Sequence, residues 1–470
     1  MKSKLVRLRF APSPTGYLHV GGLRTALYNL FLAKKLKGKL ILRVEDTDQK
    51  RLVENAEENL IKMLDWSGIV FDEGPHLGGE YGPYRQSERL LIYKKYYHQL
   101  ITDGHAYPCF YSDERLENLK NGSLSSEDAT IEDTIFKDFD KKNILKKMQN
   151  ESFIIRFKIP RNEILDYNDA VKGNIKFDFS LINDPIIIKT DGFPTYHFAN
   201  VIDDYLMKIT HVIRGEEWLP SIPKHIALYN AFNWTPPIFG HLPLLLNNDK
   251  SKLSKRKNDV SVDSYIKKGY TKESLINFLS LLGWHEKGDR ELYQLNELID
   301  SFSLERVNKS GAIFDVLKLQ SFNNHYIKSY PFNILKNKLN NFIPKDWELT
   351  EELIDLVKDK ANTLYDFTDL LEFVFIKKIS FTKDTISILK TNNAIPILTL
   401  FKKYCKLDSV AKIASTIQKE LECSPKSIWQ VIRLALTGEN HGPSLDQVIS
   451  IFGADKVEQR INHAIYQVKT

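Results

Sequence analysis

Near its start the chain reads Arg9-Phe-Ala-Pro-Ser-Pro-Thr-Gly-Tyr-Leu-His-Val-Gly-Gly22, with two prolines, three glycines and one histidine in fourteen residues. A helical pattern begins directly after this stretch. The first N–H groups of a helix lack partners inside the helix and favour an anion, and glycine lets a ligand approach the backbone. The stretch therefore predicts an anion-binding loop whose histidine donates to phosphate. The alternative is a Gly/Pro turn capped by His19. No P-loop and no Rossmann Gly-x-Gly-x-x-Gly occurs here.

The segments around this loop have the pattern of a strand–helix–strand unit. Val6, Leu8 and Phe10 alternate with arginines, apolar residues recur at helical spacing from Leu23 to Phe31, and residues 40–44 form a second apolar run. That run delivers the acidic residues of 45–48 at its carboxyl end. Ligands collect outside the carboxyl ends of strands in open α/β sheets. We therefore expect an α/β Rossmann-type, doubly wound parallel sheet, with the loop and the acidic residues facing one crevice.

The rest of the chain divides into blocks of different pattern. Residues 52–66 have helical spacing, whereas 105–188 contain a polar stretch and short β-like runs, which indicates an α/β insertion. The sheet pattern resumes at 185–188, 191–196 and 209–214, helices dominate from about 265, and the chain is expected to be helical from 311 to its end. We predict a sheet domain in two halves, residues 1–104 and 189–240, separated by the insertion at 105–188. A helical domain at 241–320 and an all-α region at 321–470 follow.

Composition narrows the class of protein. A chain of 470 residues with 42% hydrophobic and 27% charged residues is typical of soluble globular protein, and its net charge of +6 permits a nucleic-acid partner. Cys109, Cys405 and Cys423 do not make a disulfide framework and favour a reducing compartment. No apolar run reaches the roughly 18 residues of a membrane span, and the first strand begins too early for a targeting peptide. We expect a cytoplasmic protein with no membrane partner.

A second candidate for binding phosphate is the cationic run Lys250-Ser-Lys-Leu-Ser-Lys-Arg-Lys257. Five cations in eight residues ordinarily form a solvated surface or a nucleic-acid patch. Serines and a leucine interrupt the charges, however, and Asn247-Asn-Asp249 before them supplies turn residues. Such a loop could clamp a polyphosphate through Lys252 and Lys255 as charge develops on it. Both interpretations stay open for this segment alone.

Five further residues could form a pocket for a small zwitterion. Arginine binds a carboxylate through two parallel hydrogen bonds, and two arginines opposed by a glutamate suit a molecule with carboxylates and an ammonium group. The alternative is that each arginine forms an ordinary ion pair at the end of a strand. The five residues are Arg9, Glu45, Tyr196, Asn200 and Arg214.

Together these segments resemble a known family. Gly16-Tyr-Leu-His-Val-Gly-Gly22 and Lys252-Leu-Ser-Lys-Arg256 resemble the two hallmark motifs of class I aminoacyl-tRNA synthetases. Four further segments narrow the resemblance to bacterial-type glutamyl-tRNA synthetases, and it is dense over residues 5–320. These segments are Arg9-Phe-Ala-Pro-Ser-Pro-Thr-Gly16, Arg43-Val-Glu-Asp-Thr-Asp48, Asp191-Gly-Phe-Pro-Thr-Tyr-His-Phe-Ala-Asn200 and His211-Val-Ile-Arg-Gly-Glu-Glu-Trp218.

The resemblance implies a role for each matching position. The first motif comprises Pro12, Ser13, Pro14, Thr15, Gly16, Tyr17, Leu18, His19, Val20, Gly21 and Gly22, and the second comprises Lys252, Leu253, Ser254, Lys255 and Arg256. The residues that would hold glutamate are Arg9, Ala11, Ser13, Glu45, Tyr196, Asn200 and Arg214. The residues that would hold ATP are His19, Gly21, Gly22, Glu217, Trp218, Lys252, Ser254 and Lys255, and the catalytic ones among them would be His19, Lys252 and Lys255.

The resemblance also implies a two-step reaction with ATP, L-glutamate and tRNA(Glu). The α-carboxylate of glutamate would attack the α-phosphate of ATP, and a hydroxyl of the terminal adenosine of tRNA would then attack glutamyl-adenylate. Mg²⁺ would accompany ATP, activation would await tRNA binding, and catalysis would consist of positioning and charge stabilisation. Residues 105–188 would grip the acceptor stem, 241–320 would contact the stem and carry the lysine loop, and 321–470 would bind the anticodon. We expect a monomer.

Two positions depart from the family's pattern. Some members bind zinc in the insertion through cysteine and histidine, but Cys109 is the only cysteine before Cys405, so we expect no structural zinc. Relatives often have an arginine associated with reading the anticodon near the position of Lys360. Lysine cannot make the forked contact of arginine, which leaves the choice between tRNA(Glu) and tRNA(Gln) open.

Four alternatives compete with this interpretation. A non-discriminating or tRNA(Gln)-directed glutamyl-tRNA synthetase, which makes Glu-tRNA(Gln), would share every motif above. A glutaminyl-tRNA synthetase would have a β-barrel in place of the helical C-terminal part, and a short paralogue that modifies a tRNA base would lack that part. A non-enzymatic tRNA-binding module would not need His19 together with Lys252 and Lys255.

Overall fold

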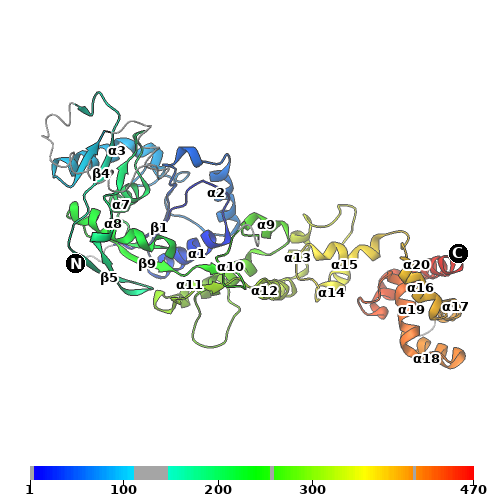
Figure 1. The fold of residues 1–470 in the computed structure, drawn as a ribbon. Helices are drawn as coiled ribbons and strands as arrows, with labels where there is room; N and C mark the ends of the chain where they lie inside the picture. Colours follow the sequence, from blue (N-terminus) through cyan, green and yellow to red (C-terminus); the bar gives the residue numbers. More distant parts are fainter. Residues whose placement is uncertain (1–4, 111–146, 255–258, 406–408) are drawn as a thin grey trace. The chain divides into compact units, whose positions relative to one another are not determined.

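The structure, a computed structural model, describes residues 5–110, 147–254, 259–405 and 409–470. It separates into two compact units, whose elements Figure 1 labels along the chain. Unit 1 comprises Met1–Tyr265 and Leu275–Val316, and unit 2 comprises Ile266–Ser274 and Leu317–Thr470. The division falls within helices α9 (Val262–Lys267) and α10 (Lys272–Leu281).

Unit 1 is built around a four-stranded parallel sheet. In spatial order its strands are β2 (Lys39–Leu42), β1 (Arg7–Phe10), β8 (His211–Gly215) and β9 (Ile238–Leu242). Helix α1 (Val20–Lys35) connects β1 to β2, which confirms the predicted strand–helix–strand unit and the parallel fold class. The strand order reverses beside β1, so the carboxyl ends of β1 and β8 border the crevice where open α/β sheets bind ligands.

Helices cover both faces of this sheet, because alternate side chains of each strand point to opposite faces. On one face Arg9 bonds to Asp204 of α7 (Tyr196–Leu206) and Arg7 bonds to the carbonyl of Met207, which follows that helix. On the other face the ring of Phe10 approaches Gly22 of α1. The apolar core on the α7 side also contains side chains of α3 (Leu90–Thr102) and α8 (Ile222–Ala231). All four residues of β1 are therefore buried, arginines included.

The remaining strands of unit 1 lie outside the parallel sheet. One antiparallel sheet joins β3 (Ala106–Cys109), β4 (Ile154–Phe157) and β7 (Ile186–Ile188), and β5 (Ile164–Asp169) and β6 (Gly173–Asp178) form a hairpin. The prediction that 185–188 resume the parallel sheet is wrong, because Ile188 pairs with Ile155 of β4. Helix α11 (Leu295–Ser301) packs against α1.

Two predicted helical segments begin later than expected. Helix α2 spans Ala56–Trp66, not 52–66, because Asn55 has a left-handed backbone (φ 59°) that no helix can include. The prediction of helix from 311 onward is wrong at Ala312–Ile313, which forms β11 and pairs with β10 (Leu245–Leu246). The first helix after it starts at Val316.

The described part of unit 2 after α10 consists of helices, which confirms the predicted all-α region. Amphipathic spacing explains them: in α18 the buried residues Val410, Ile413, Ala414 and Ile417 recur three or four positions apart. These side chains and those of neighbouring helices form one apolar core. None of the described helices is long and apolar enough to cross a membrane. The helices are α12 (Val316–Ser329), α13 (Phe332–Leu339), α14 (Glu351–Val357), α15 (Asp366–Phe375), α16 (Lys383–Thr391), α17 (Ala394–Tyr404), α18 (Val410–Leu421), α19 (Pro425–Thr437) and α20 (Leu445–Lys469).

A buried ion pair ties β1 to the segment that follows α2. Arg7 donates two hydrogen bonds of 2.8 Å to the carboxylate of Glu73, and the hydroxyl of Tyr84 donates a third at 2.5 Å. Hydrogen bonding from Arg7, against the opposing effect of burial, lowers the pKa of Glu73 from 4.5 to about 2. The folded protein therefore holds Glu73 ionised at a pH where the unfolded chain would protonate it.

The substitution Glu73→Gln should destabilise the protein at pH 7 by about 3 kcal/mol, because it leaves the Arg7 charge buried without its anion. The pKa of Glu73 is lower in the folded state, so its stabilising contribution is complete above about pH 5 and is lost as the pH falls towards 2. Thermal unfolding across this range should therefore show a weaker acid dependence in the variant than in the parent. Parallel curves would contradict this role for the ion pair.

Candidate active site

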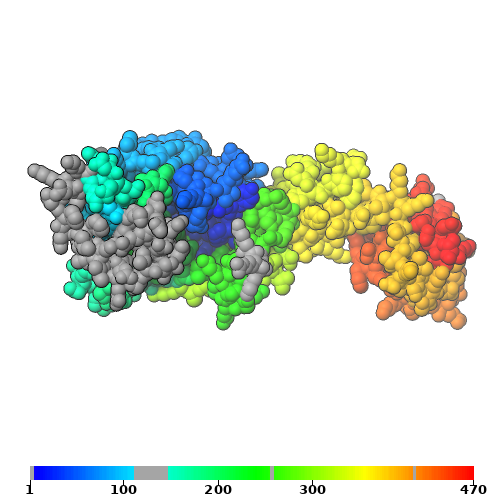
Figure 2. Space-filling view, turned by 45° about the horizontal axis from the view of Figure 1, so that its top comes forward, coloured from blue at the N-terminus to red at the C-terminus, as the bar shows by residue number. Residues whose placement is uncertain are grey.

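A cavity of about 1130 Å³ lies at the carboxyl ends of β1 and β8. It is bounded by the loop between β1 and α1, by residues that follow β2, by the start of α7 and by the segment after β10. In Figure 2 the darkest blue atoms, from the N-terminal segment, lie recessed between lighter blue and green atoms of the same unit. The crevice expected from the strand pattern is therefore present.

Most residues predicted for the site line this cavity. They include the first motif from Pro12 to Gly22 except Val20, six of the seven residues expected to hold glutamate (Arg9, Ala11, Ser13, Glu45, Tyr196 and Arg214), and Glu217, Trp218, Lys252, Leu253 and Ser254. Val20 and Asn200 are buried and do not line it. Lys255 and Arg256 lie outside the described residues, and Lys360 is exposed in unit 2.

His19 is the N-cap of α1. Its Nδ1 accepts the backbone N–H of Gly21 at 3.0 Å and that of Gly22 at 3.4 Å. A ring nitrogen that accepts carries no proton, so the proton of the neutral imidazole is on Nε2. The capping role and the donor role weighed from the sequence are thus compatible, since they use different ring nitrogens. A Cβ at Gly21 would come 2.8 Å from Cε1 of His19, which explains the glycine.

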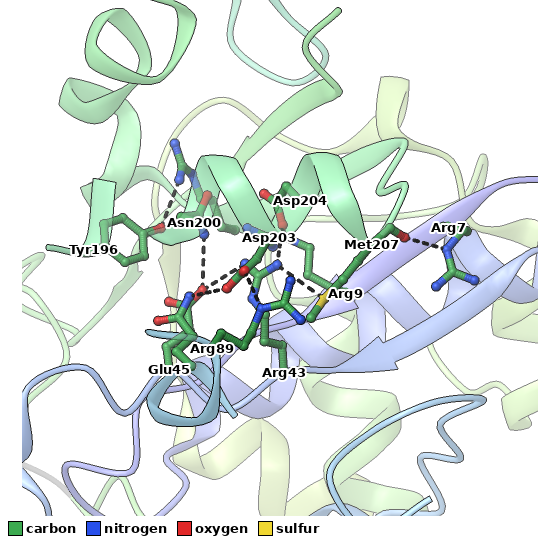
Figure 3. Close-up of polar contacts among 12 residues, drawn as sticks. Arg7, Arg9, Arg43, Glu45, Arg89, Tyr196, Asn200, Asp203, Asp204 and Met207 are labelled. Atoms are coloured by element: carbon green, nitrogen blue, oxygen red, sulfur yellow. Dashed lines mark hydrogen bonds and ion pairs between the residues drawn. The ribbon is translucent and has the colours of Figure 1, made fainter. Parts of the chain in front are cut away.

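Below α7 a network of charged side chains reaches the cavity through Arg9 and Glu45 (Figure 3). Arg43 donates to Asp204 at 2.7 Å and to Glu45 at 2.9 Å, and Arg9 donates from Nε to the same oxygen of Asp204 at 3.1 Å. Asn200 donates to Glu45 at 3.1 Å, so it holds Glu45 from behind. The expected Glu45 and Arg9 are therefore joined through two residues, Arg43 and Asp204, that were not predicted for the site.

The two carboxylates of this network differ in pKa. Burial alone would raise the pKa of Asp204, but Arg43 and Arg9 outweigh it and the net shift is downward. Burial raises the pKa of Glu45, and Arg43 and Arg9 offset only part of that effect. Of these two carboxylates, Glu45 is the one whose burial is less fully compensated by positive charge, and it is also the one that lines the cavity.

Arg214 is held by neutral acceptors. Its Nε donates to Nε2 of His241 at 3.0 Å, Nη1 donates to the hydroxyl of Tyr196 at 3.0 Å, and Nη2 donates to the carbonyl of Trp218 at 3.3 Å. Among the described residues it has no carboxylate partner, so the strand-end ion pair considered from the sequence is not formed there. Arg9 does form such a pair, but only through Nε. Arg214 brings a buried positive charge to the cavity wall without an anion to match it.

An exposed aromatic ring, next to Tyr196, and the start of the lysine-rich loop also line the cavity. Trp218 is 37% exposed and lies with its ring centroid 4.2 Å from that of Tyr196. The loop begins as the predicted turn: Asn247 N–H donates to the Ser251 carbonyl at 2.8 Å. Leu253 N–H then donates to the Leu245 carbonyl at 2.9 Å, which fixes the backbone around the exposed Lys252.

The residues that sequence reasoning missed are Arg43, Asp204, His241 and Asp169, the last of which bonds to His241. A signal existed for some of them. Asp203 and Asp204 are consecutive acids within the apolar pattern of α7, and a charged residue in a buried helix face needs a partner. The sequence around Arg43, His241 and Asp169 contains no local pattern that would have identified them as site residues.

The comparisons with known proteins agree with this geometry. A family model described as "tRNA synthetases class I (E and Q), catalytic domain" matches residues 5–321, and one described as "Anticodon binding domain" matches 326–465. The glutamate–tRNA ligase of Chlorobaculum parvum is 42% identical over 100% of this chain and 99% of its own length, and that of Clostridioides difficile is 41% identical over 97% and 98%. A solved structure of a glutamate–tRNA ligase from Elizabethkingia meningosepticum in complex with its amino acid has a TM-score of 0.86 and 33% identity, covering 98% of this chain and 99% of that one.

The contribution of the His19 cap to stability can be measured with a pair of substitutions. His19→Ala removes the cap of α1 and should cost about 1 kcal/mol of stability, whereas His19→Asn supplies another strong N-cap and should cost only a few tenths. Chemical denaturation of both variants and the parent measures this difference. Equal stability of the two variants would show that the cap contributes nothing.

Proposed function

The chain belongs to the glutamate–tRNA ligase family of class I aminoacyl-tRNA synthetases, and we propose that the cavity joins L-glutamate to tRNA with ATP through the residue roles given below. The observation that carries these roles is the composition of a single cavity. One part of its wall has an uncompensated arginine and a glutamate, and another has a helix N-terminus, a histidine donor and a lysine. The first suits a zwitterion and the second suits a polyphosphate.

In the amino-acid half, Arg214 and Arg9 receive the carboxylates of glutamate. Among the described residues, no carboxylate bonds to Arg214, and the side chain of Arg9 is engaged only through Nε. Glu45, held by Arg43 and Asn200, faces the ammonium group. Ala11 and Ser13 line the cavity beside them, and Tyr196 both lines it and accepts from Arg214.

In the ATP half, Nε2–H of His19 and the N-terminus of α1 at Gly21 and Gly22 face the phosphates. Trp218 offers an exposed ring face to the adenine base. The side chain of Glu217 folds back against Gly215, where any Cβ would overlap its carboxylate. Lys252 and Ser254 line the same cavity, and Lys255, which lies outside the described residues, completes the second motif.

The proposed first step forms a bond between the glutamate α-carboxylate oxygen and the α-phosphorus of ATP and breaks the bond to the β-phosphate, so pyrophosphate leaves with its electron pair. In the second step a hydroxyl of the terminal adenosine of tRNA attacks the acyl carbon, its proton is lost, and AMP leaves. His19 and the lysines stabilise the charge that moves towards pyrophosphate. Mg²⁺ arrives with ATP in this proposal. The described residues contain no group of three His, Cys, Asp or Glu side chains suited to a metal.

The proposal extends to tRNA recognition. Residues 105–188 grip the acceptor stem, 241–320 contact the stem, and 321–470 bind the anticodon of tRNA(Glu), with Lys360 as a candidate contact. A lysine in place of the family's arginine supports a second candidate function, charging of tRNA(Gln) as well. We also propose a monomer that works in the cytoplasm and holds no structural zinc, which elemental analysis of the purified protein would test.

Glutamate-dependent exchange between ATP and pyrophosphate tests the proposed chemistry. The parent should catalyse this exchange in the presence of tRNA(Glu) and much more weakly without it. His19→Asn keeps the cap through its side-chain oxygen, but its shorter side chain places no donor at the position of Nε2, so its exchange rate should fall by roughly 100-fold, the scale of one lost transition-state donor, while tRNA affinity stays unchanged. Its near-parental stability serves as the control for folding.

Two outcomes would contradict these roles. Exchange that proceeds equally well with glutamine in place of glutamate would contradict the amino-acid half. A parental exchange rate in His19→Asn would contradict the ATP half. Charging of purified tRNA(Glu) and tRNA(Gln) in parallel decides between the two candidate functions, since efficient charging of both would identify a non-discriminating enzyme.

A further inference from the structure

The β5–β6 hairpin delivers a carboxylate to the back of the amino-acid pocket. Asp169 ends β5, and its Oδ1 accepts backbone N–H groups from Val171 (3.0 Å), Lys172 (2.9 Å) and His241 (3.1 Å). Its Oδ2 lies 2.6 Å from Nδ1 of His241. Both side chains are fully buried. Burial alone would raise the pKa of Asp169, but hydrogen bonds from His241 and from the backbone of Val171 and Lys172 outweigh it, so the acid is ionised and acts only as an acceptor.

These contacts determine which nitrogen of His241 carries the proton. An ionised Asp169 accepts from Nδ1, so Nδ1 is protonated. Nε2 accepts from Nε of Arg214 at 3.0 Å, so Nε2 must be bare. Burial lowers the pKa of His241 and the nearby Arg214 adds to that effect, which keeps the ring neutral. His241 therefore has one tautomer that satisfies both neighbours.

The chain of contacts ends at the pocket. A guanidinium has five N–H groups, and three of those of Arg214 go to His241, Tyr196 and the Trp218 carbonyl. Among the described residues this leaves one N–H on each Nη, which is the pair that a carboxylate binds. The ring of Phe239 lies 5.3 Å beneath the guanidinium and limits its tilt.

We propose that Asp169 and His241 are positioning residues for glutamate: Asp169 fixes the tautomer of His241, and His241 holds Arg214 so that both Nη groups face the substrate. The proposal rests on the function proposed above for Arg214. Neither residue touches the substrate. Their effect is on the orientation of the group that binds it, as second-layer carboxylates orient histidine ligands elsewhere.

The hairpin has other attachments, so the Asp169–His241 bond is not required to hold it in place. Its strands pair over the six residues of each, Phe239 N–H donates to the Tyr167 hydroxyl at 3.3 Å, and Lys172 forms an ion pair with Glu216. A substitution at Asp169 can therefore change the tautomer of His241 without detaching the hairpin.

Asp169→Asn is the test, because an asparagine can keep its oxygen on the three backbone N–H groups and turn its amide N–H₂ to His241. Nδ1 would then accept, Nε2 would carry the proton, and two donors would face each other at Arg214. The KM for glutamate should rise by about 10- to 100-fold in tRNA charging, with the KM for ATP within roughly twofold of the parent. Arg214→Ala should show the same selectivity. Asp166→Asn, on the same hairpin but half-exposed and 3.9 Å from Lys176, is the matched control and should leave both values unchanged.

A spectroscopic measurement and a rescue separate positioning from folding. The ¹⁵N shifts of His241, assigned by their absence in His241→Gln, should show Nδ1 protonated in the parent and Nε2 protonated in Asp169→Asn. The double variant D169N/H241Q should regain most of the glutamate affinity, because a glutamine oxygen at position 241 accepts from Arg214 without any ring tautomer. This rescue is expected even if Asp169→Asn alone is poorly stable.

The inference and the proposed function fail in different ways. If the parent does not charge tRNA with glutamate, the proposed function fails whatever the tautomer. If the parent charges tRNA and the tautomer switches while the KM for glutamate stays unchanged, the inference is overturned and the function stands. Equal losses for glutamate and ATP in Asp169→Asn, with no recovery in the double variant, would show a structural role only and would also overturn the inference.

Discussion

A guanidinium that leaves water has to find acceptors for its N–H groups inside the protein. In unit 1 this requirement is met under α7, where Arg9 of β1, Arg43 after β2 and Arg89 before α3 bond to acids of that helix. Arg9 and Arg43 share Asp204, and Arg89 donates to Asp203 at 2.7 Å, with Tyr93 and Gln86 as further donors to that acid. Two consecutive acids of one helix thus fix how α7 lies on the sheet. Since α7 begins at Tyr196 and carries Asn200, the same contacts place one wall of the cavity (Figure 3).

Arg214 differs from these arginines in the acceptors that hold its guanidinium. Its described partners are an imidazole nitrogen, a hydroxyl and a carbonyl, none of which carries a negative charge. The protein therefore satisfies its hydrogen bonds without cancelling its charge. Arg7, Arg43 and Arg89 are paired with carboxylates, whereas Arg214 has no carboxylate partner among the described residues and can accept an anion from outside. A binding site for a carboxylate requires an arginine of this kind, which neutral acceptors hold in place and which keeps N–H groups for the ligand.

Much of this arrangement could be predicted from the sequence, because its signals are local. The loop from Arg9 to Gly22, the parallel strand pattern and the turn before Lys252 depend on neighbouring residues, and the described structure contains all three. The missing parts depend on contacts between distant segments: Arg43 meets Asp204 across 161 positions, and Asp169 meets His241 across 72. The prediction of the sheet for residues 186–188 was wrong for a related reason. An apolar run of three residues does not indicate which sheet the strand will join.

The reach of the β5–β6 hairpin bears on how this protein can vary. Insertions between the halves of a domain are often regarded as modules that lineages gain, lose or exchange without disturbing the parent domain. Here the β5–β6 hairpin, which lies in the segment predicted to be an insertion, supplies Asp169 to His241 of β9, so the two segments share one proton. A chimera that took this insertion from a relative lacking an acid at that position would leave His241 free to adopt either tautomer. Residues 169 and 241 should therefore be inherited together, because the hydrogen bond between them joins the predicted insertion to the parallel sheet.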